Sequence, residues 1–424
     1  MEQCRRERYL LLIAAAFVIL NQITLALVQG FHSRMVWPMV VWLGAVVGLQ
    51  RIMARRLPHH DPYLLPAMLL LTGWGLNLVT RLAPSFSNRQ ALWLALSVVV
   101  LVGLVHTTTD LAWLKRYHYH WLVVGMSLLA ATIIYGVNPS GFGPRLWLGA
   151  SIYFQPSELL KVVMVTFLAG YFADHWRVLR RQHIPIGQRL TIPSPAFFTP
   201  IVLMFSLCMV LLIWQRDLGA ATIFFVVFLL MLYIASGQWL LLVGGGVLLV
   251  LAGLVGYVLF DVVALRVDVW LNPWQESEGR AFQIVQSLMA VAAGGLTGTG
   301  IGQGLPTFIP VVHSDFVFAA IAEEWGLVGV LGLIVALGVL IFRGMRLAIL
   351  NQDNPFLALL SAGLSLLLAT QSLLIIGGTL RLWPLTGVTL PFVSYGGSSL
   401  VISFVIVGLL LMISEETWRE NSAT

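Results

Sequence analysis

Apolar stretches of membrane-spanning length recur along this chain of 424 residues. Hydrophobic residues make up 59% of the sequence and charged residues only 10%, which is far from the balance of a soluble domain. Each stretch holds roughly 17–23 residues, enough for one helix to cross about 30 Å of hydrocarbon. In lipid, a segment this apolar satisfies its backbone by forming a helix. We therefore predict an all-α polytopic membrane protein.

About twelve transmembrane helices are predicted from these stretches. They cover residues 8–29, 36–51, 62–82, 90–109, 120–136, 157–173, 198–214, 218–235, 238–260, 316–342, 353–376 and 397–414. Most of the connections between them are short, but residues 261–315 form one long outer loop. Loops of this length in compact proteins are commonly functional.

Lysine and arginine indicate the orientation. With a cytoplasmic N-terminus, 15 of the 24 basic residues fall in inside segments. They are Arg5, Arg6, Arg8, Arg51, Arg55, Arg56, Lys115, Arg116, Arg177, Arg180, Arg181, Arg189, Arg343, Arg346 and Arg419. The positive-inside rule then predicts that both termini are cytoplasmic, including a tail at 415–424. The net charge of +6 reflects this membrane topology, so we expect no nucleic-acid partner. The histidines His59, His60, His118 and His120 are expected to be solvated on the cytoplasmic side.

A carboxylate and an amine stand at the beginning of the helix predicted at 157–173. The sequence Gln-Pro-Ser-Glu-Leu-Leu-Lys at 155–161 places Glu158 and Lys161 at positions i and i+3, so they share one helix face and can pair. Ionisable groups within membrane spans are functional candidates by default. The pair either serves a polar interior site or is a neutralised structural pair.

The long loop contains the other acidic candidates and a string of glycines. Asp268, Glu276 and Glu278 lie in its first half, and Gly294, Gly295, Gly298, Gly300, Gly302 and Gly304 follow. Glycine amides can cradle phosphate. A dinucleotide-binding motif, however, needs a βαβ unit, which is missing here. We expect a tight turn packed on the membrane face.

Further polar groups accompany the last predicted helices. Asp217 and Asp315 precede helices, where an aspartate either caps the helix or binds a ligand. Glu323 and Glu324 are adjacent, so they cannot share a helix face. One is expected to face a cavity, and the other a partner such as Arg343 or a backbone amide.

Five sequence blocks, taken in order, resemble the SEDS family (shape, elongation, division and sporulation; FtsW, RodA and SpoVE). They are Arg-Leu-Trp-Leu-Gly at 145–149 with Phe-Gln-Pro-Ser-Glu-Leu-Leu-Lys at 154–161, Gln-Arg-Asp-Leu-Gly at 215–219, His-Ser-Asp-Phe-Val-Phe-Ala at 313–319, Glu-Glu-Trp-Gly at 323–326, and the run from Pro384 to Ser399. The resemblance implies a ten-helix core over residues 62–414. Residues 1–51 would then be two additional N-terminal transmembrane helices.

The resemblance implies a peptidoglycan glycosyltransferase of cell wall biogenesis, acting in cell shape or cell division. Such proteins polymerise lipid II, an undecaprenyl-pyrophosphate-linked disaccharide peptide, at the outer face of the bacterial cytoplasmic membrane. Their usual partner is a class B penicillin-binding protein. Two alternatives remain: a lipid II flippase, and a catalytically weak scaffold for that transpeptidase.

The family places an essential aspartate in the long loop, where this chain has Glu276. Glutamate keeps the carboxylate but adds one methylene, and we predict that Glu276 is the general base. Glu278 and Asp268 are the fallback candidates. The leaving pyrophosphate needs cationic stabilisation, which a divalent metal could also supply.

The residues predicted to bind substrate or pyrophosphate are Arg145, Lys161, Arg216, Arg280, Gln283, His313 and Ser394. Glu158, Asp217, Asp315, Glu323 and Glu324 are expected to be structural or to line a polar cavity. Arg216 and Arg381 depart from the family, which usually has proline and glycine there. They either bind phosphate or snorkel to the membrane surface.

Overall fold

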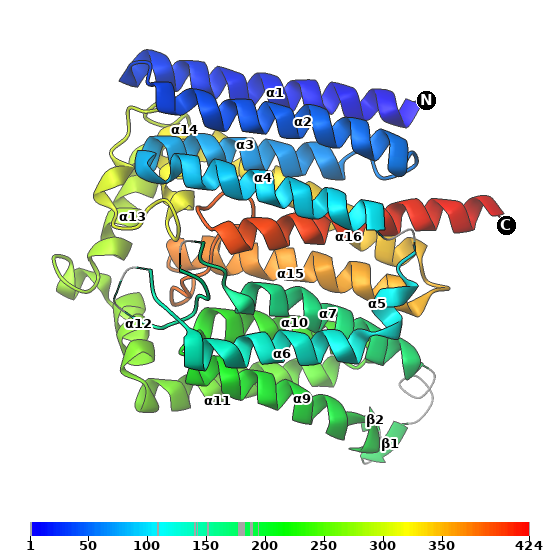
Figure 1. Cartoon of the computed structure of the whole chain (residues 1–424). Coiled ribbons are helices and arrows are strands. Elements are labelled where there is room, and N and C mark those ends of the chain that lie inside the picture. The colour runs from blue at the N-terminus through cyan, green and yellow to red at the C-terminus, as the bar shows by residue number, and fades with distance from the viewer. Residues whose placement is uncertain are drawn as a thin grey trace. The chain divides into compact units, whose positions relative to one another are not determined.

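The computed structural model describes residues 2–423 apart from 108, 109, 140, 142, 151, 177–182, 187–189 and 194. The four arginines predicted between residues 177 and 189 lie outside the described residues. The α-helices are α1 (Glu2–Gln29), α2 (Val36–Arg56), α3 (Leu64–Leu82), α4 (Pro84–Thr107), α5 (Ala112–Arg116), α6 (His118–Tyr135), α7 (Pro156–Asp174), α9 (Pro195–Trp214), α10 (Leu218–Ser236), α11 (Trp239–Leu259), α12 (Asp261–Leu271), α13 (Phe282–Gly294), α14 (Val317–Leu350), α15 (Pro355–Thr379) and α16 (Gly397–Ala423) (Figure 1). Short 3-10 turns are η1 (Ser33–Met35), η2 (Pro273–Glu276) and η3 (Pro306–Phe308).

Eleven helices in the described part of the chain are long and apolar enough to cross a membrane. The span predicted at 198–214 lies within α9, where the apolar stretch Ile201–Trp214 is shorter than those of the eleven helices. The prediction of an all-α polytopic membrane protein is confirmed. One small addition is the antiparallel hairpin of β1 (His183–Ile186) and β2 (Leu190–Pro193), which is not predicted from the sequence.

The chain forms two compact units. Unit 1 consists of Met1–Thr109, Gly253–Arg343 and Gln371–Thr424, and unit 2 of Asp110–Ala252 and Gly344–Thr370. Three helices, α11, α14 and α15, contribute residues to both units.

The centre of unit 1 is formed by α3 and α16. In each of these helices 89% of the membrane-length window is buried, against 28% in α1 and in α2. Close packing explains this burial, since α16 lies against α4 and α3, while α1 packs on α3 and α2 on α4. Glycines permit the tightest contacts, because a Cβ on Gly397 would lie 2.0 Å from the ring of Trp93.

The centre of unit 2 is α7, with 83% of its window buried against α6, α10 and α5. Gly125 and Gly170 leave room for Leu160 and His118 at these contacts. In α11, by contrast, only 11% of the window is buried. Its apolar side chains face outward, as expected of a helix in contact with lipid or with a partner helix.

The predicted outer loop is largely helical. Residues 261–315 contain α12, η2, α13 and η3, so the segment is built from short helices joined by turns. The predicted tail at 415–424 is also helical, because α16 continues to Ala423 and buries Glu415. Glu415 accepts a hydrogen bond from the amide of His59 at 2.7 Å.

The long helix α14 is broken at Gly326, whose φ of 63° and ψ of −160° are not helical. The break leaves carbonyls and amides without partners inside the helix. The glycine string supplies these partners: Thr299 N donates to Glu323 O at 2.9 Å, and Leu327 N donates to Gly295 O at 3.0 Å. The expected tight turn of glycines is present, and it packs against the break in α14.

Candidate active site

The predicted site residues are divided between the two units. Unit 2 contains Arg145, Glu158, Lys161, Arg216 and Asp217, and unit 1 contains all the others. We therefore describe the two sets separately.

In unit 2, Glu158 and Lys161 form a buried ion pair on the first turns of α7. Lys161 Nζ lies 2.7 Å from Glu158 Oε2, and the side chains are 3% and 13% exposed. The helix begins at Pro156, where a fixed φ and a missing N–H suit the first turn. The predicted pairing at i and i+3 is confirmed.

Asp217 joins the second sequence block to the first. Its Oδ1 accepts a hydrogen bond from Ala220 N at 3.1 Å, which caps α10 as predicted. Its Oδ2 accepts from Ser157 Oγ at 2.8 Å and from Gln155 Nε2 at 3.3 Å. One carboxylate therefore ties the beginning of α10 to the beginning of α7.

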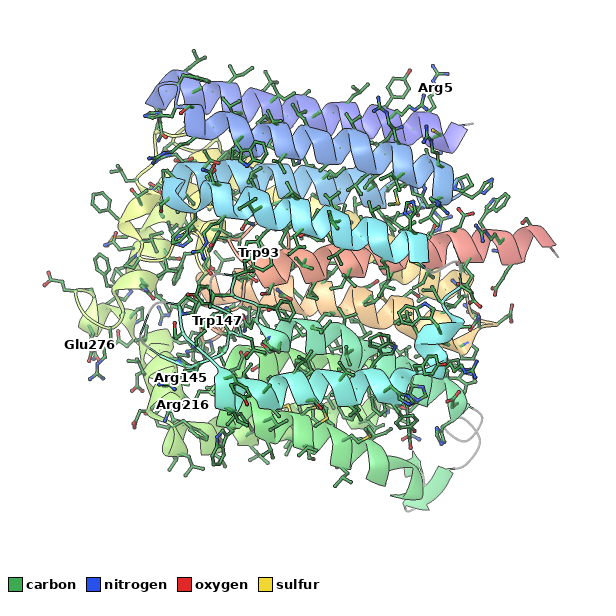
Figure 2. The ribbon with its side chains drawn as sticks, in the orientation of Figure 1. Arg5, Trp93, Arg145, Trp147, Arg216 and Glu276 are labelled. Carbon is green, nitrogen blue, oxygen red and sulfur yellow. The ribbon has the colours of Figure 1, made fainter. Side chains whose placement is uncertain are left out.

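Arg145 and Arg216 are exposed and lie at the same end of the unit 2 helices (Figure 2). Residues 147 and 148 form short antiparallel bridges with Val137 and Phe154, which fold the Arg145 segment back on itself. Arg216 has a φ of 60°, which proline cannot adopt. The backbone here therefore differs from that of a chain with the usual family proline.

In unit 1, Glu276 ends the turn η2 between α12 and α13. It lies at the end of the unit opposite Arg5 (Figure 2). Its side chain is 56% exposed, and its Oε2 is 3.7 Å from Nε of Arg280, which is 70% exposed. Glu278 is exposed as well, and Gln283 is half-buried on the first turn of α13. The carboxylate of Glu276 is therefore accessible from solvent.

Asp268, a fallback candidate, is engaged elsewhere. Its Oδ1 accepts a hydrogen bond from the hydroxyl of Tyr257 at 3.0 Å, on the exposed face of α12. This contact distinguishes Asp268 from Glu276, whose described partner is a basic side chain.

A second polar group in unit 1 surrounds the beginning of α14. Ser394 Oγ donates to Ser314 O at 2.6 Å, and Tyr395 N donates to His313 O at 2.8 Å. The rings of His313, Phe86 and Tyr395 form a mutual cluster, in which the centroids of Phe86 and Tyr395 lie 5.2 and 5.6 Å from that of His313 and 4.8 Å from each other. Burial lowers the pKa of His313, because it disfavours the charged imidazolium.

Asp315 accepts a hydrogen bond from Ser314 Oγ at 2.7 Å, and this is the contact its carboxylate makes in place of the capping bond considered from the sequence. Burial raises the pKa of Asp315, while the Ser314 hydroxyl and the charge of Arg266 act in the opposite direction. Arg266 also donates to Thr386 O at 3.3 Å. The predictions did not include Arg266, which the sequence places only as one basic residue in a long loop.

Glu323 and Glu324 are buried at the break in α14, as expected for adjacent residues with different partners. Glu323 Oε1 accepts from Leu305 N at 2.8 Å, which confirms the predicted backbone amide. Glu324 pairs instead with Arg81 of α3, whose Nε is 3.3 Å from Glu324 Oε1. Arg343, the other partner considered, pairs instead with Asp61.

Arg81 is a residue that the predictions missed. It also donates to Gly304 O at 3.0 Å, so it joins α3 to both the broken helix and the glycine string. A signal was available, since Arg81 is the one charged side chain in the span predicted at 62–82.

The described residues hold no group of three or more His, Cys, Asp or Glu side chains that could bind a metal ion.

Two of the histidines expected to be solvated are buried. His60 and His118 are 4% and 5% exposed rather than solvated, and His60 Nε2 lies 3.0 Å from Glu7 Oε2.

These features define a polytopic membrane protein with polar clusters at the ends of its helices. The family model described as cell cycle protein (FtsW, RodA and SpoVE) matches residues 75–419. The chain belongs to this family.

The chain is 34% identical over 437 residues to peptidoglycan glycosyltransferase RodA of Mycobacterium tuberculosis (strain H37Rv), covering 98% of this chain and 92% of that protein. It is 33% identical to stage V sporulation protein E of Bacillus subtilis, covering 78% and 87%. A solved chain from a peptidoglycan synthase complex that coordinates polymerization and crosslinking matches with a TM-score of 0.71 and 26% identity, covering 85% of this chain and 99% of that one. The alignment with the Mycobacterium tuberculosis protein covers 98% of this chain and so includes α1 and α2, whereas the family model begins only at residue 75.

Proposed function

We propose that this protein polymerises lipid II into glycan strands, with Glu276 as the general base. The relatives named as peptidoglycan glycosyltransferases match nearly the full length of the chain, and the chain is an enzyme of that class. The observation that carries the residue assignment is the accessible carboxylate of Glu276, on a turn held between two short helices.

The proposed reaction is an inverting transfer. Glu276 takes the proton from a saccharide hydroxyl, and the oxygen of that hydroxyl attacks the anomeric carbon of the lipid-linked sugar. The bond from that carbon to the pyrophosphate oxygen breaks, and the lipid pyrophosphate leaves with the electron pair. Arg280, four residues after Glu276, is proposed to stabilise the charge that develops. The pyrophosphate-binding role of Arg145, Lys161 and Arg216, which all belong to unit 2, stays a prediction from the sequence. Gln283, His313 and Ser394 are proposed to contact the sugars.

We further propose the bacterial cytoplasmic membrane as the location, with both termini in the cytoplasm and Glu276 at the outer face. The opposite placement of Arg5 and Glu276 in unit 1 supports this orientation, because basic residues favour the cytoplasmic side (Figure 2). A class B penicillin-binding protein is the proposed partner. The exposed apolar side chains of α11 offer a surface for its transmembrane helix.

The test is a polymerisation assay on purified protein with lipid II, alone and with its transpeptidase. We expect strands from the wild type and a loss of about 10²–10⁴-fold in rate for Glu276→Gln, since a general base contributes this much. Glu278→Gln is the matched control, because it removes an exposed carboxylate two residues away. Asp268→Asn tests the other fallback.

Two outcomes would support the alternatives. Translocation of the lipid headgroup without strand growth would indicate a flippase. A stable transpeptidase complex with neither activity would indicate a scaffold. Normal polymerisation by Glu276→Gln would remove this residue as the base.

A further inference from the structure

The turn that follows α15 has an arginine in a backbone conformation that favours glycine. Arg381 has a φ of 59°, in the left-handed region. A residue with a Cβ is less stable there by about 1–2 kcal/mol. The side chain must therefore make contacts that offset this cost.

The guanidinium of Arg381 binds the C-terminal end of α12. Its Nε donates to Trp270 O and its Nη2 donates to Leu271 O, both at 2.6 Å. In return, Trp270 Nε1 donates to Arg381 O at 3.2 Å. The last carbonyls of a helix have no partner within the helix, and a cation at that end is favourable. Arg381 therefore fixes the point at which α12 ends.

The same turn also holds α13. Ser287 Oγ, on the buried face of α13, donates to Thr379 O at 3.3 Å. Residues 379–381 thus contact both α12 and α13, the two helices that flank the segment 272–281. We call this segment the Glu276 turn. The helices on its two sides are tied to one short stretch of chain by contacts that span 111 residues for α12 and 92 for α13.

We propose that Arg381 is a positioning residue that holds the Glu276 turn in its active geometry. The proposal rests on the proposed function of Glu276 as the base. A catalytic carboxylate displaced by about 1 Å can lose a hundredfold in rate. Two charged hydrogen bonds to the end of α12, five residues before Glu276, oppose such a displacement. The contacts with α12 also explain the arginine better than snorkelling or phosphate binding, because its guanidinium faces backbone carbonyls.

The experiment compares wild type with Arg381→Gly and Arg381→Lys in the full-length protein. Glycine suits the left-handed backbone and removes only the side chain, so the fold is expected to persist. Lysine keeps the charge but cannot donate to two carbonyls as a planar fork. Val311→Gly is the control, since it places glycine at another left-handed position of unit 1, with a φ of 56°, whose exposed apolar side chain cannot donate to the end of α12.

The first readout is amide hydrogen exchange of residues 272–281. We expect exchange about tenfold faster in Arg381→Gly, an intermediate rate in Arg381→Lys and no change outside the turn and its flanking helices. Unchanged exchange in Arg381→Gly would overturn the proposal. This readout does not depend on activity, so it tests whether Arg381 holds the Glu276 turn even if the wild type makes no strands. Absence of strands from the wild type would reject the proposed function and not the contact of Arg381 with the turn.

The second readout is the rate of lipid II polymerisation. We expect kcat to fall about 10- to 100-fold in Arg381→Gly with KM nearly unchanged. Adding Arg381→Gly to Glu276→Gln should cause little further loss, because both act through one carboxylate. A raised KM with unchanged kcat would show that Arg381 binds substrate, and would overturn the positioning role.

Discussion

Each unit contains an acidic and a basic side chain one helical turn apart, and the two pairs differ in almost every physical respect. Glu158 and Lys161 are 2.7 Å apart and nearly enclosed, whereas Glu276 and Arg280 are 3.7 Å apart and mostly exposed. The first pair lies on a long, buried helix, and the second on a turn between short helices. A separation of three residues in one pair and four in the other therefore yields a buried structural contact in one place and an accessible carboxylate in the other.

The difference follows from what surrounds each pair. A buried charge must keep its partner, because leaving it unpaired in a low dielectric is costly. An exposed charge is solvated with or without a partner, so its pairing contributes little. The carboxylate of Glu276 is therefore accessible, as its proposed role requires, whereas that of Glu158 is held by Lys161.

The largest effect is expected from breaking the buried pair. Lys161→Met leaves the Glu158 carboxylate buried without its cation, and should reduce the free energy of unfolding by about 3–5 kcal/mol. Denaturant unfolding in detergent measures this loss. The double variant Glu158→Gln/Lys161→Met, which removes both charges, should recover much of it. An equal loss in the double variant would show that packing, not charge, maintains the contact.

A smaller effect is expected at another buried pair, His60 and Glu7 of unit 1. Burial lowers the pKa of His60, but the hydrogen bond and charge of Glu7, with the charge of Asp61, outweigh it and leave the pKa raised above 6.5. A raised pKa in the folded state adds stability that is complete below pH 6.5 and is lost as the pH rises through the folded-state value.

We therefore expect the melting temperature of the wild type to fall as the pH rises above 6.5, relative to that of His60→Gln. Thermal unfolding of both proteins across this range gives the difference. Parallel curves would show that unfolding releases no proton from His60 in this pH range.

The smallest effect on stability is expected at the exposed pair. Arg280→Ala should change the free energy of unfolding by less than about 0.5 kcal/mol, as for other surface positions. The same denaturant titration used for Lys161→Met provides the comparison. A loss as large as that of Lys161→Met would contradict the contrast between the two pairs.

The sequence predicts those parts of the structure that depend on local or repeating patterns. Apolar length predicts the spanning helices, and the spacing of Glu158 and Lys161 predicts their contact. Asp217 before α10 predicts its cap. Each of these depends on residues within about one helical turn or on hydrophobicity summed over a span. The assignment of residues 1–51 as two helices added to a ten-helix core stays a prediction.

Contacts between distant segments could not be predicted in this way. Glu324 and Arg81 are separated by more than two hundred residues, and the choice of Arg81 over Arg343 depends on how α3 and α14 pack. The guanidinium contacts of Arg381 depend in the same way on where α12 ends. The helices α12 and α13 within 261–315 are shorter than a membrane span, so apolar length does not distinguish them from a loop.

The break in α14 restricts the sequence of the segment that follows α13. A Cβ on Gly298 would lie 2.2 Å from Glu324 O, and one on Gly326 would lie 2.3 Å from Gly298 N. No side chain fits between these backbones. The contact between the glycine string and the break in α14 therefore tolerates neither alanine at these two glycines nor an inserted residue. Residues 275–280 are exposed except for the half-buried Ser277, and they carry no such restriction. An epitope tag or fluorophore placed there would report on the surface, whereas a label at 294–300 would separate the two halves of a membrane helix.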